Sequence, residues 1–138
     1  MRLLILNGPN LNLLGVREPE IYGSTTLGEL ERGLGSTFPE LDFTFAQSNV
    51  EGELIDAIQQ ADADGLDGVV FNPGGFAHTS VALRDAIASV RTRVVEVHIS
   101  NVYAREDFRR EMILAGVCEG IVSGFGMRGY YLAVQSFL

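Results

Sequence analysis

The chain has 138 residues, which is the usual length of a single domain. It contains one cysteine, Cys118, and no apolar run near the ~20 residues that cross a bilayer, which argues against an internal disulfide, a thiolate metal cluster and a membrane span. The formal net charge of −8 would repel nucleic acid. All ten basic residues are arginines, which excludes Schiff-base catalysis and a lysine-dependent phosphate loop. We expect a cytoplasmic protein that binds neither membranes nor nucleic acid.

The first predicted strand is the continuous apolar run at residues 3–6, and an irregular segment follows it. Residues 11–25 contain Gly15, Pro19 and Gly23 and show no sustained period. A loop of this length in a compact domain is usually a functional lid or disordered. This one carries Arg17 and Tyr22.

Two capping-box spacings predict the starts of the next helices. Thr26 and Glu29 precede an apolar stripe of helical spacing, and Ser48 and Glu51 precede a second one. Between them, residues 41–46 alternate apolar and polar side chains, which indicates a strand at the edge of a sheet.

The centre of the chain is predicted to be a buried strand, a glycine loop and a helix. The run at residues 69–71 suits a strand buried on both faces, and Asn72 with the following Pro-Gly-Gly ends it. Thr79 or Ser80 can cap the helix that continues to Val90. In open α/β sheets, ligands bind outside the carboxyl ends of the strands, so we expect the site at this edge.

The remaining residues predict two more strands, at 93–97 and 119–123, and two more helices. One helix is expected from about Arg105, with Phe108, Met112 and Ala115 on one face, and the other at 130–137. Five strands alternating with five helices predict a single α/β domain over residues 1–138. The pattern favours a flavodoxin-like three-layer sandwich with a parallel sheet of order 2-1-3-4-5.

Polar side chains of several kinds are expected at the carboxyl edge of this sheet. They are Asn10, Arg17, Tyr22, Asn72, His78, His98, Ser100 and Arg109. Glu96 precedes His98 by two residues on the same face of its strand, and if it is buried it needs a partner. Two histidines without paired carboxylates are weak support for a metal site. The set predicts a small-anion site with acid–base groups.

Each of these residues also has a purely structural interpretation. The asparagines can form Asx turns beside Pro9 and Pro73. Either histidine taken singly is more often a surface or core residue than a functional one. Tyr22 can pack on the sheet, and the arginines can be solvated surface charges.

Four segments resemble the type II 3-dehydroquinate dehydratases over almost the whole chain: NGPNLNLLGVREPEIYG, QSNVEGELI, NPGGFAHTSVALRDA and EVHISNVYAREDFRR. Four motifs in the family's order are far more specific than a lone glycine loop. The resemblance implies a flavodoxin-like fold, no metal or cofactor, and a homododecamer built as a tetramer of trimers. It also implies removal of water from 3-dehydroquinate to give 3-dehydroshikimate, in the shikimate route to aromatic amino acids.

The resemblance also implies roles for individual residues. Tyr22 would take the C2 proton, Arg17 would support its anion, His98 would protonate the departing hydroxyl and Glu96 would orient His98. Asn10 would help to stabilise the enolate through a water. The substrate carboxylate and hydroxyls would be held by Asn72, Ile99, Ser100, His78 and Arg109, and by Asp85 of a neighbouring subunit.

Two other functions fit the same fold. A flavin- or phosphate-binding domain would be expected to carry a short loop rich in serine and threonine after the first strand, and here the loop is long. A non-catalytic interaction module would have an accessible lid. It would have no activity, so changing Tyr22 or His98 would have no catalytic effect.

Overall fold

The computed structural model describes residues 1–138 and contains one parallel five-stranded sheet of order β2-β1-β3-β4-β5. The strands are β1 (Arg2–Asn7), β2 (Asp42–Gln47), β3 (Gly68–Asn72), β4 (Arg93–His98) and β5 (Gly120–Ser123). The predicted strand order is therefore confirmed. Most of the observed strand ends differ by one residue from the predicted ends, and the others agree.

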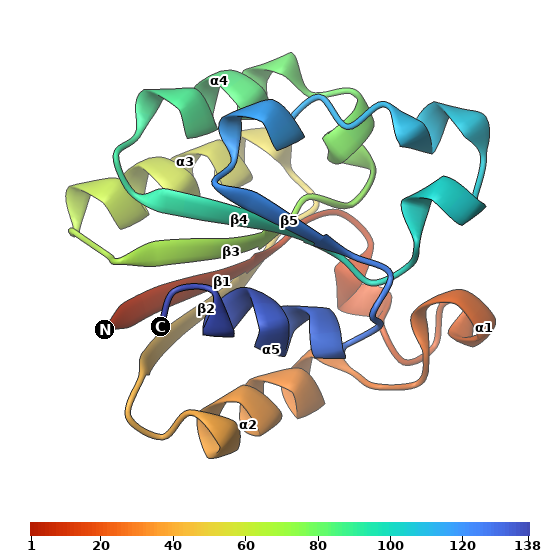
Figure 1. Cartoon of the computed structure of the whole chain (residues 1–138), viewed down its shortest axis with the longest axis horizontal. Helices are drawn as coiled ribbons and strands as arrows, with labels where there is room; N and C mark the ends of the chain where they lie inside the picture. Colours follow the sequence, from red (N-terminus) through yellow and green to blue (C-terminus); the bar gives the residue numbers. More distant parts are fainter.

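Helices cover both faces of the sheet and complete the predicted three layers (Figure 1). They are α1 (Pro19–Tyr22), α2 (Leu27–Thr37), α3 (Glu51–Ala63), α4 (Val81–Ser89) and α5 (Arg128–Gln135). Figure 1 shows α3 and α4 on one face and α2 and α5 on the other. No helix combines the length and the apolar character needed to cross a membrane.

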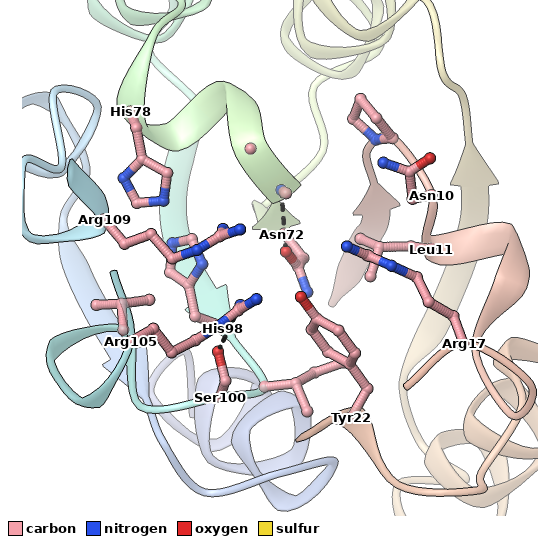
Figure 2. Close-up of a pocket in the computed structure, with 15 residues that line it drawn as sticks. Asn10, Leu11, Arg17, Tyr22, Asn72, His78, His98, Ser100, Arg105 and Arg109 are labelled. Atoms are coloured by element: carbon pink, nitrogen blue, oxygen red, sulfur yellow. Dashed lines mark hydrogen bonds between the residues drawn. The ribbon is translucent and has the colours of Figure 1, made fainter. Parts of the chain in front are cut away.

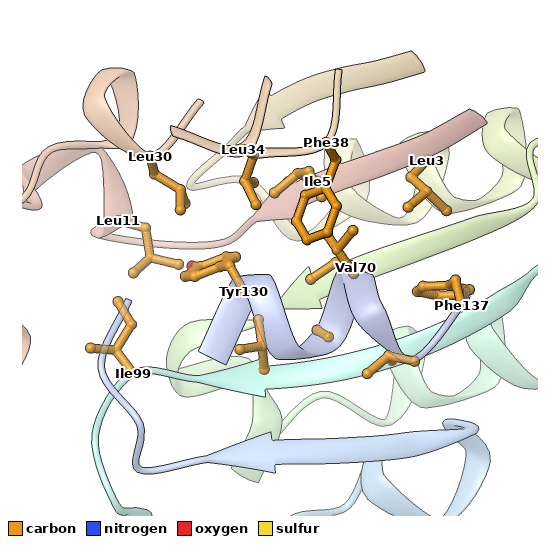
Figure 3. Close-up of a cluster of buried hydrophobic side chains, with 14 of the residues drawn as sticks. Leu3, Ile5, Leu11, Leu30, Leu34, Phe38, Val70, Ile99, Tyr130 and Phe137 are labelled. Atoms are coloured by element: carbon orange, nitrogen blue, oxygen red, sulfur yellow. The ribbon is translucent and has the colours of Figure 1, made fainter. Parts of the chain in front are cut away.

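The sheet divides the hydrophobic core into two clusters. One cluster of 15 buried residues lies between the sheet and α2 and α5, and Figure 3 shows its packing around Tyr130 and Phe38. The other has 11 buried residues and lies against α3 and α4. The central strand β3 contributes to both, and all five of its residues are buried. This explains why it reads as a continuous apolar run, whereas the edge strand β2 alternates.

The helix starts agree with the predicted caps in two cases and differ in a third. The Thr26 hydroxyl accepts a hydrogen bond from the Glu29 amide at 3.2 Å, and the Ser80 hydroxyl accepts one from the Leu83 amide at 2.9 Å. The predicted capping box at Ser48 is wrong, because α3 begins at Glu51 and Val50 is its N-cap. Ser48 instead accepts from the Val50 amide, which forms a tight turn before the helix.

The predicted helix from Arg105 is also wrong. The connection from β4 to β5 consists of three short 3₁₀ turns, η3 (Val102–Ala104), η4 (Asp107–Arg110) and η5 (Ala115–Val117). Between η4 and η5 the Ile113 amide donates to the carbonyl of Ala77 at 2.9 Å. That tertiary hydrogen bond replaces the one that Ile113 would have made in a helix. Phe108, expected on one face of this helix with Met112 and Ala115, is 60% exposed.

The long segment after β1 is ordered in the structure and contains the short turn η1 (Leu11–Leu13) and α1. Leu11 and Leu14 are buried in the core and fix its first part. Asn10, just before this segment, has a positive φ angle of 71°, and Glu18 within it has one of 40°. Non-glycine residues rarely adopt this conformation, and it concentrates at functional sites. We refer to residues 11–25 as the lid.

Candidate active site

A pocket lies at the carboxyl edge of the sheet, where β1, β3 and β4 end beside the lid (Figure 2). Nine of the predicted site residues line it: Asn10, Arg17, Tyr22, Asn72, His78, His98, Ile99, Ser100 and Arg109. These residues lie up to about a hundred positions apart in the sequence. The fold brings them together because the carboxyl ends of parallel strands lie at one edge of the sheet.

The lining contains three arginines, Arg17, Arg105 and Arg109, and no carboxylate. The protein as a whole carries a net charge of −8, so the local charge of the pocket is opposite to that of the molecule. Guanidinium groups donate hydrogen bonds in a planar arrangement that suits carboxylates. The three guanidinium groups therefore make the lining chemically suited to a small anion.

His98 and Glu96 form a buried pair on β4. Their exposed fractions are 6% and 0%, and His98 Nε2 lies 2.5 Å from Glu96 Oε2. The two side chains share a face because side chains alternate along a strand. No hydrogen bond in the structure occupies His98 Nδ1, so this nitrogen is free for a ligand in the pocket. The prediction that Glu96 finds its partner in His98 is confirmed.

Cys118 contacts the other oxygen of the same carboxylate, with its Sγ 3.8 Å from Glu96 Oε1. Burial, together with the nearby Glu96 carboxyl, raises the pKa of the Cys118 thiol to about 12. The thiol is therefore protonated near neutral pH, and it packs against the pair as a neutral group.

His78 stands at the end of the glycine loop η2 (Gly74–His78), with its ring centroid 6.3 Å from that of His98. Its Nδ1 lies 2.9 Å from the carbonyl oxygen of Glu111, so Nδ1 carries the hydrogen and donates it. Burial is the main cause that lowers the His78 pKa below its ordinary value, and the neighbouring His98 and Arg109 act in the same direction. A neutral ring with Nδ1–H presents Nε2 as an acceptor.

Tyr22 lies at the end of α1 with its ring between two guanidinium groups. Arg17 Cζ is 4.8 Å from the ring centroid and Arg105 Cζ is 5.3 Å from it. Both distances are within the range of a cation–π contact. The Tyr22 hydroxyl has no hydrogen-bond partner among the protein groups. Its ring is therefore held by two cations while its hydroxyl is unengaged.

Asn72 and Ser100 use part of their hydrogen-bonding capacity on the protein. Asn72 Oδ1 accepts from the Gly74 amide at 3.1 Å, and its Nδ2 donates to the hydroxyl of Tyr130 at 2.9 Å. Ser100 Oγ accepts from Arg105 Nη1 at 3.2 Å. Ile99, which lies between His98 and Ser100 in the chain, is buried and also lines the pocket.

Asn10 and Arg109 are fixed through the groups behind them. The backbone amide of Asn10 donates to Asn49 Oδ1 at 2.9 Å, and the Asn10 side chain remains free at the pocket. Arg109 Nε donates to Glu106 Oε2 at 2.7 Å, so its two terminal nitrogens remain for a ligand. Arg109 lies on η4 and not on the helix that the sequence predicted.

Asp85 is the one predicted site residue that lies away from this pocket. It is exposed on α4 and is not part of the lining. The resemblance assigned it to the site of a neighbouring subunit, and an exposed position on α4 leaves it accessible for such a contact.

Sequence reasoning did not select Arg105, although it lines the pocket and contacts both Tyr22 and Ser100. Its position shortly after β4 was an available signal. The sequence analysis used it only as the approximate start of a predicted helix. Tyr130, whose hydroxyl accepts from Asn72, and Asn7, which accepts from Tyr130, were not selected either. Tyr130 lies far from the site in sequence, and nothing in its surroundings there indicates the contact.

The fold and the pocket together define a flavodoxin-like α/β protein with an arginine-lined pocket at the carboxyl edge of its sheet. The family model described as "Dehydroquinase class II" matches residues 1–138. The chain belongs to the class II dehydroquinase family.

Individual relatives agree with this assignment. The chain is 58% identical to a 3-dehydroquinate dehydratase of Bacillus pumilus over 96% of its length and 90% of that protein. It is 56% identical to one of Deinococcus radiodurans, over 96% of its length and 94% of that protein. A type II dehydroquinase structure from Butyrivibrio crossotus superposes with a TM-score of 0.96 at 44% identity, covering 99% of this chain and 97% of the other.

Proposed function

We propose that this protein dehydrates 3-dehydroquinate to 3-dehydroshikimate by anti elimination through an enolate, in the shikimate route. One observation carries the proposal. A single arginine-lined pocket holds a tyrosine flanked by two cations and a histidine paired with a buried carboxylate. This set offers a base, an acid and binding groups for an anion, and the relatives named above are 3-dehydroquinate dehydratases.

Tyr22 is the base that removes the proton from C2. This proton lies alpha to the C3 ketone, so its loss gives an enolate that hydrogen-bond donors can stabilise. A phenol must itself be ionised to act as a base, and nearby cations favour the anion. Arg17 and Arg105 both lie within about 5 Å of the ring, which supports this role. Asn10, whose side chain is free at the pocket, helps to stabilise the enolate through a water.

His98 is the acid that protonates the hydroxyl leaving C1. Glu96 holds Nε2, so Nδ1 is the ring nitrogen left to deliver a proton to the pocket. Tyr22 is on the lid and His98 is on the sheet. A base and an acid carried by separate elements can act on two faces of one ring, which permits anti elimination.

The remaining groups bind the substrate. Asn72, the Ile99 amide and Ser100 hold its carboxylate at the end of the central strands. His78 and Arg109 hold its ring hydroxyls, and the acceptor Nε2 of His78 suits an O–H donor.

We also infer a homododecamer of four trimers, in which Asp85 enters the pocket of a neighbouring subunit. Its exposure on α4 and the absence of a carboxylate from the pocket lining support this contact. Asp85→Ala should weaken substrate binding only in the assembled protein. A monomer with full activity would contradict the inference.

The direct test is the ultraviolet absorbance of the purified protein mixed with 3-dehydroquinate. The product is a conjugated enone carboxylate and absorbs where the substrate does not. We expect absorbance to rise, and to do so after treatment with a chelator and with borohydride, because no metal or imine takes part in the proposed reaction. A folded protein that gives no rise would contradict the proposal.

A further inference from the structure

Two asparagines and one tyrosine form a buried hydrogen-bonded network behind the pocket. Asn7 ends β1 and Asn72 ends β3, and the two residues are partners in the parallel register. Tyr130 of α5 reaches both, and the exposed fractions of the three residues are 4%, 3% and 0%. Only Asn72 lines the pocket.

The direction of the hydrogen bonds in this network follows from one backbone group. The Gly74 amide can only donate, so the Asn72 atom that it contacts at 3.1 Å is the oxygen Oδ1. The Asn72 nitrogen must then face the Tyr130 hydroxyl, 2.9 Å away, and donate to it. Figure 2 shows the amide oxygen of Asn72 joined to the loop and its nitrogen on the other side.

The hydroxyl proton of Tyr130 has one remaining acceptor in the structure. Its oxygen accepts from Asn72, and Asn7 Oδ1 lies 2.5 Å away as the acceptor. Burial raises the pKa of Tyr130 far above its ordinary value, so the phenol keeps this proton. The chain of donors thus runs from Asn72 through Tyr130 to Asn7, and no fully buried side-chain nitrogen or oxygen of the network lacks a partner.

We propose that Tyr130 is a positioning residue that fixes the amide of Asn72 so that it turns an N–H, and not a carbonyl, toward the pocket. An amide nitrogen has two hydrogens, and Tyr130 uses one of them. The second is left for an acceptor of the ligand. The site therefore selects an acceptor or anion at this point, and on the proposed function, on which this step rests, that group is the substrate carboxylate.

The kinetic test compares two tyrosines of the same helix. Tyr130→Phe removes the hydroxyl and keeps the ring in the core. We expect KM for 3-dehydroquinate to rise about 3- to 10-fold with kcat within about twofold, because a hydrogen bond that supports ground-state and transition-state binding alike is weakened. Tyr131→Phe is the matched control, since the Tyr131 hydroxyl makes no hydrogen bond to the protein, and it should change neither constant.

A double-mutant cycle shows whether Tyr130 acts through Asn72. In an Asn72→Ala background, Tyr130→Phe should cause no further rise in KM, because the group that it positions is gone. Equal increases with and without Asn72 would overturn the inference. So would an unchanged KM in Tyr130→Phe itself.

Neutron diffraction on the unaltered protein tests the network without any variant and without activity. We expect a deuterium on Tyr130 directed at Asn7, and a deuterium on Asn72 Nδ2 directed at Tyr130. A Tyr130 deuterium directed at Asn72 would overturn the inference even in an active enzyme. A protein that shows the expected network but does not turn over 3-dehydroquinate would refute the proposed function and leave the orientation of Asn72 established.

Discussion

The two halves of the candidate site differ in how they are built. The half on the sheet is buried and hydrogen-bonded: Glu96 and Asn72 are 0% and 3% exposed, and each is held by a neighbouring side chain. The half on the lid is more open. The side chain of Arg17 is 32% exposed, and Tyr22 is half-buried, with its ring packed against the core and two arginines and its hydroxyl without a hydrogen bond.

This difference indicates when each half acquires its working geometry. The proposed acid, His98, and its partner Glu96 are fixed by the core. The proposed base, Tyr22, lies on a segment held by Leu11 and Leu14 at one end and by the cap of α2 at the other. We therefore expect the sheet to set binding and proton donation, and the lid to set proton removal as it closes and excludes water.

The largest expected effect is at the base. Tyr22→Phe should lower kcat by about 10³-fold or more, because a positioned acid or base contributes about 10²- to 10⁴-fold. Far-ultraviolet circular dichroism should be unchanged. The control is Tyr103→Phe, which removes the hydroxyl of a tyrosine that is 59% exposed outside the pocket. A rate near that of the parent in Tyr22→Phe would refute the role of the lid.

The second effect concerns the cation on the lid. Arg17→Ala should lower kcat about 10²-fold with little change in KM, since its charge acts on the base and not on the bound substrate. Arg110→Ala, at an arginine outside the pocket, should change neither constant. A large rise in KM with unchanged kcat would contradict this account.

The third effect concerns the carboxylate behind the acid. Glu96→Gln should lower kcat about 10-fold, because the carboxylate that holds His98 Nε2 is replaced by a neutral amide. Glu119→Gln, at an exposed glutamate paired with Arg93, is the control and should keep the parent rate. An unchanged kcat in Glu96→Gln would contradict the role given to the half of the site on the sheet.

The smallest effect is on stability and follows from His78. Burial lowers its pKa in the folded protein, so between that pKa and about 6.5 the unfolded chain binds more protons than the folded one. Stability from this group is complete above about pH 6.5 and is lost as the pH falls through this window. Urea midpoints at pH 7.5 and 5.5 should show a larger drop for the parent than for His78→Gln. Equal drops would contradict the assignment.

Much of the sheet could be predicted because its signals are local. A strand buried on both faces reads as a continuous apolar run, and the Pro-Gly-Gly after Asn72 marks its end. The error after β4 arose from a contact that no local pattern contains. The Ile113 amide donates a hydrogen bond to the carbonyl of Ala77, 36 positions away. This hydrogen bond competes with the helix that the spacing of Phe108 and Met112 predicted.

The contacts of the site likewise divide into those that the local sequence could predict and those that it could not. The pairing of His98 with Glu96 could be predicted, because residues two apart on a strand share a face. The roles of Arg105 and Tyr130 could not, because each depends on a partner brought by another element. Tyr130 lies 58 positions from Asn72 and 123 from Asn7, and only the packing of α5 on the sheet joins them.

The stereochemistry of proton removal tests the division between lid and sheet most directly. The substrate is 3-dehydroquinate with deuterium in one or the other of its two C2 positions, and the product is weighed by mass spectrometry. If Tyr22 on the lid removes the proton and His98 on the sheet protonates the leaving hydroxyl, the hydrogen anti to that hydroxyl is lost and the other is retained. Loss of the syn hydrogen, or of both equally, would contradict the account.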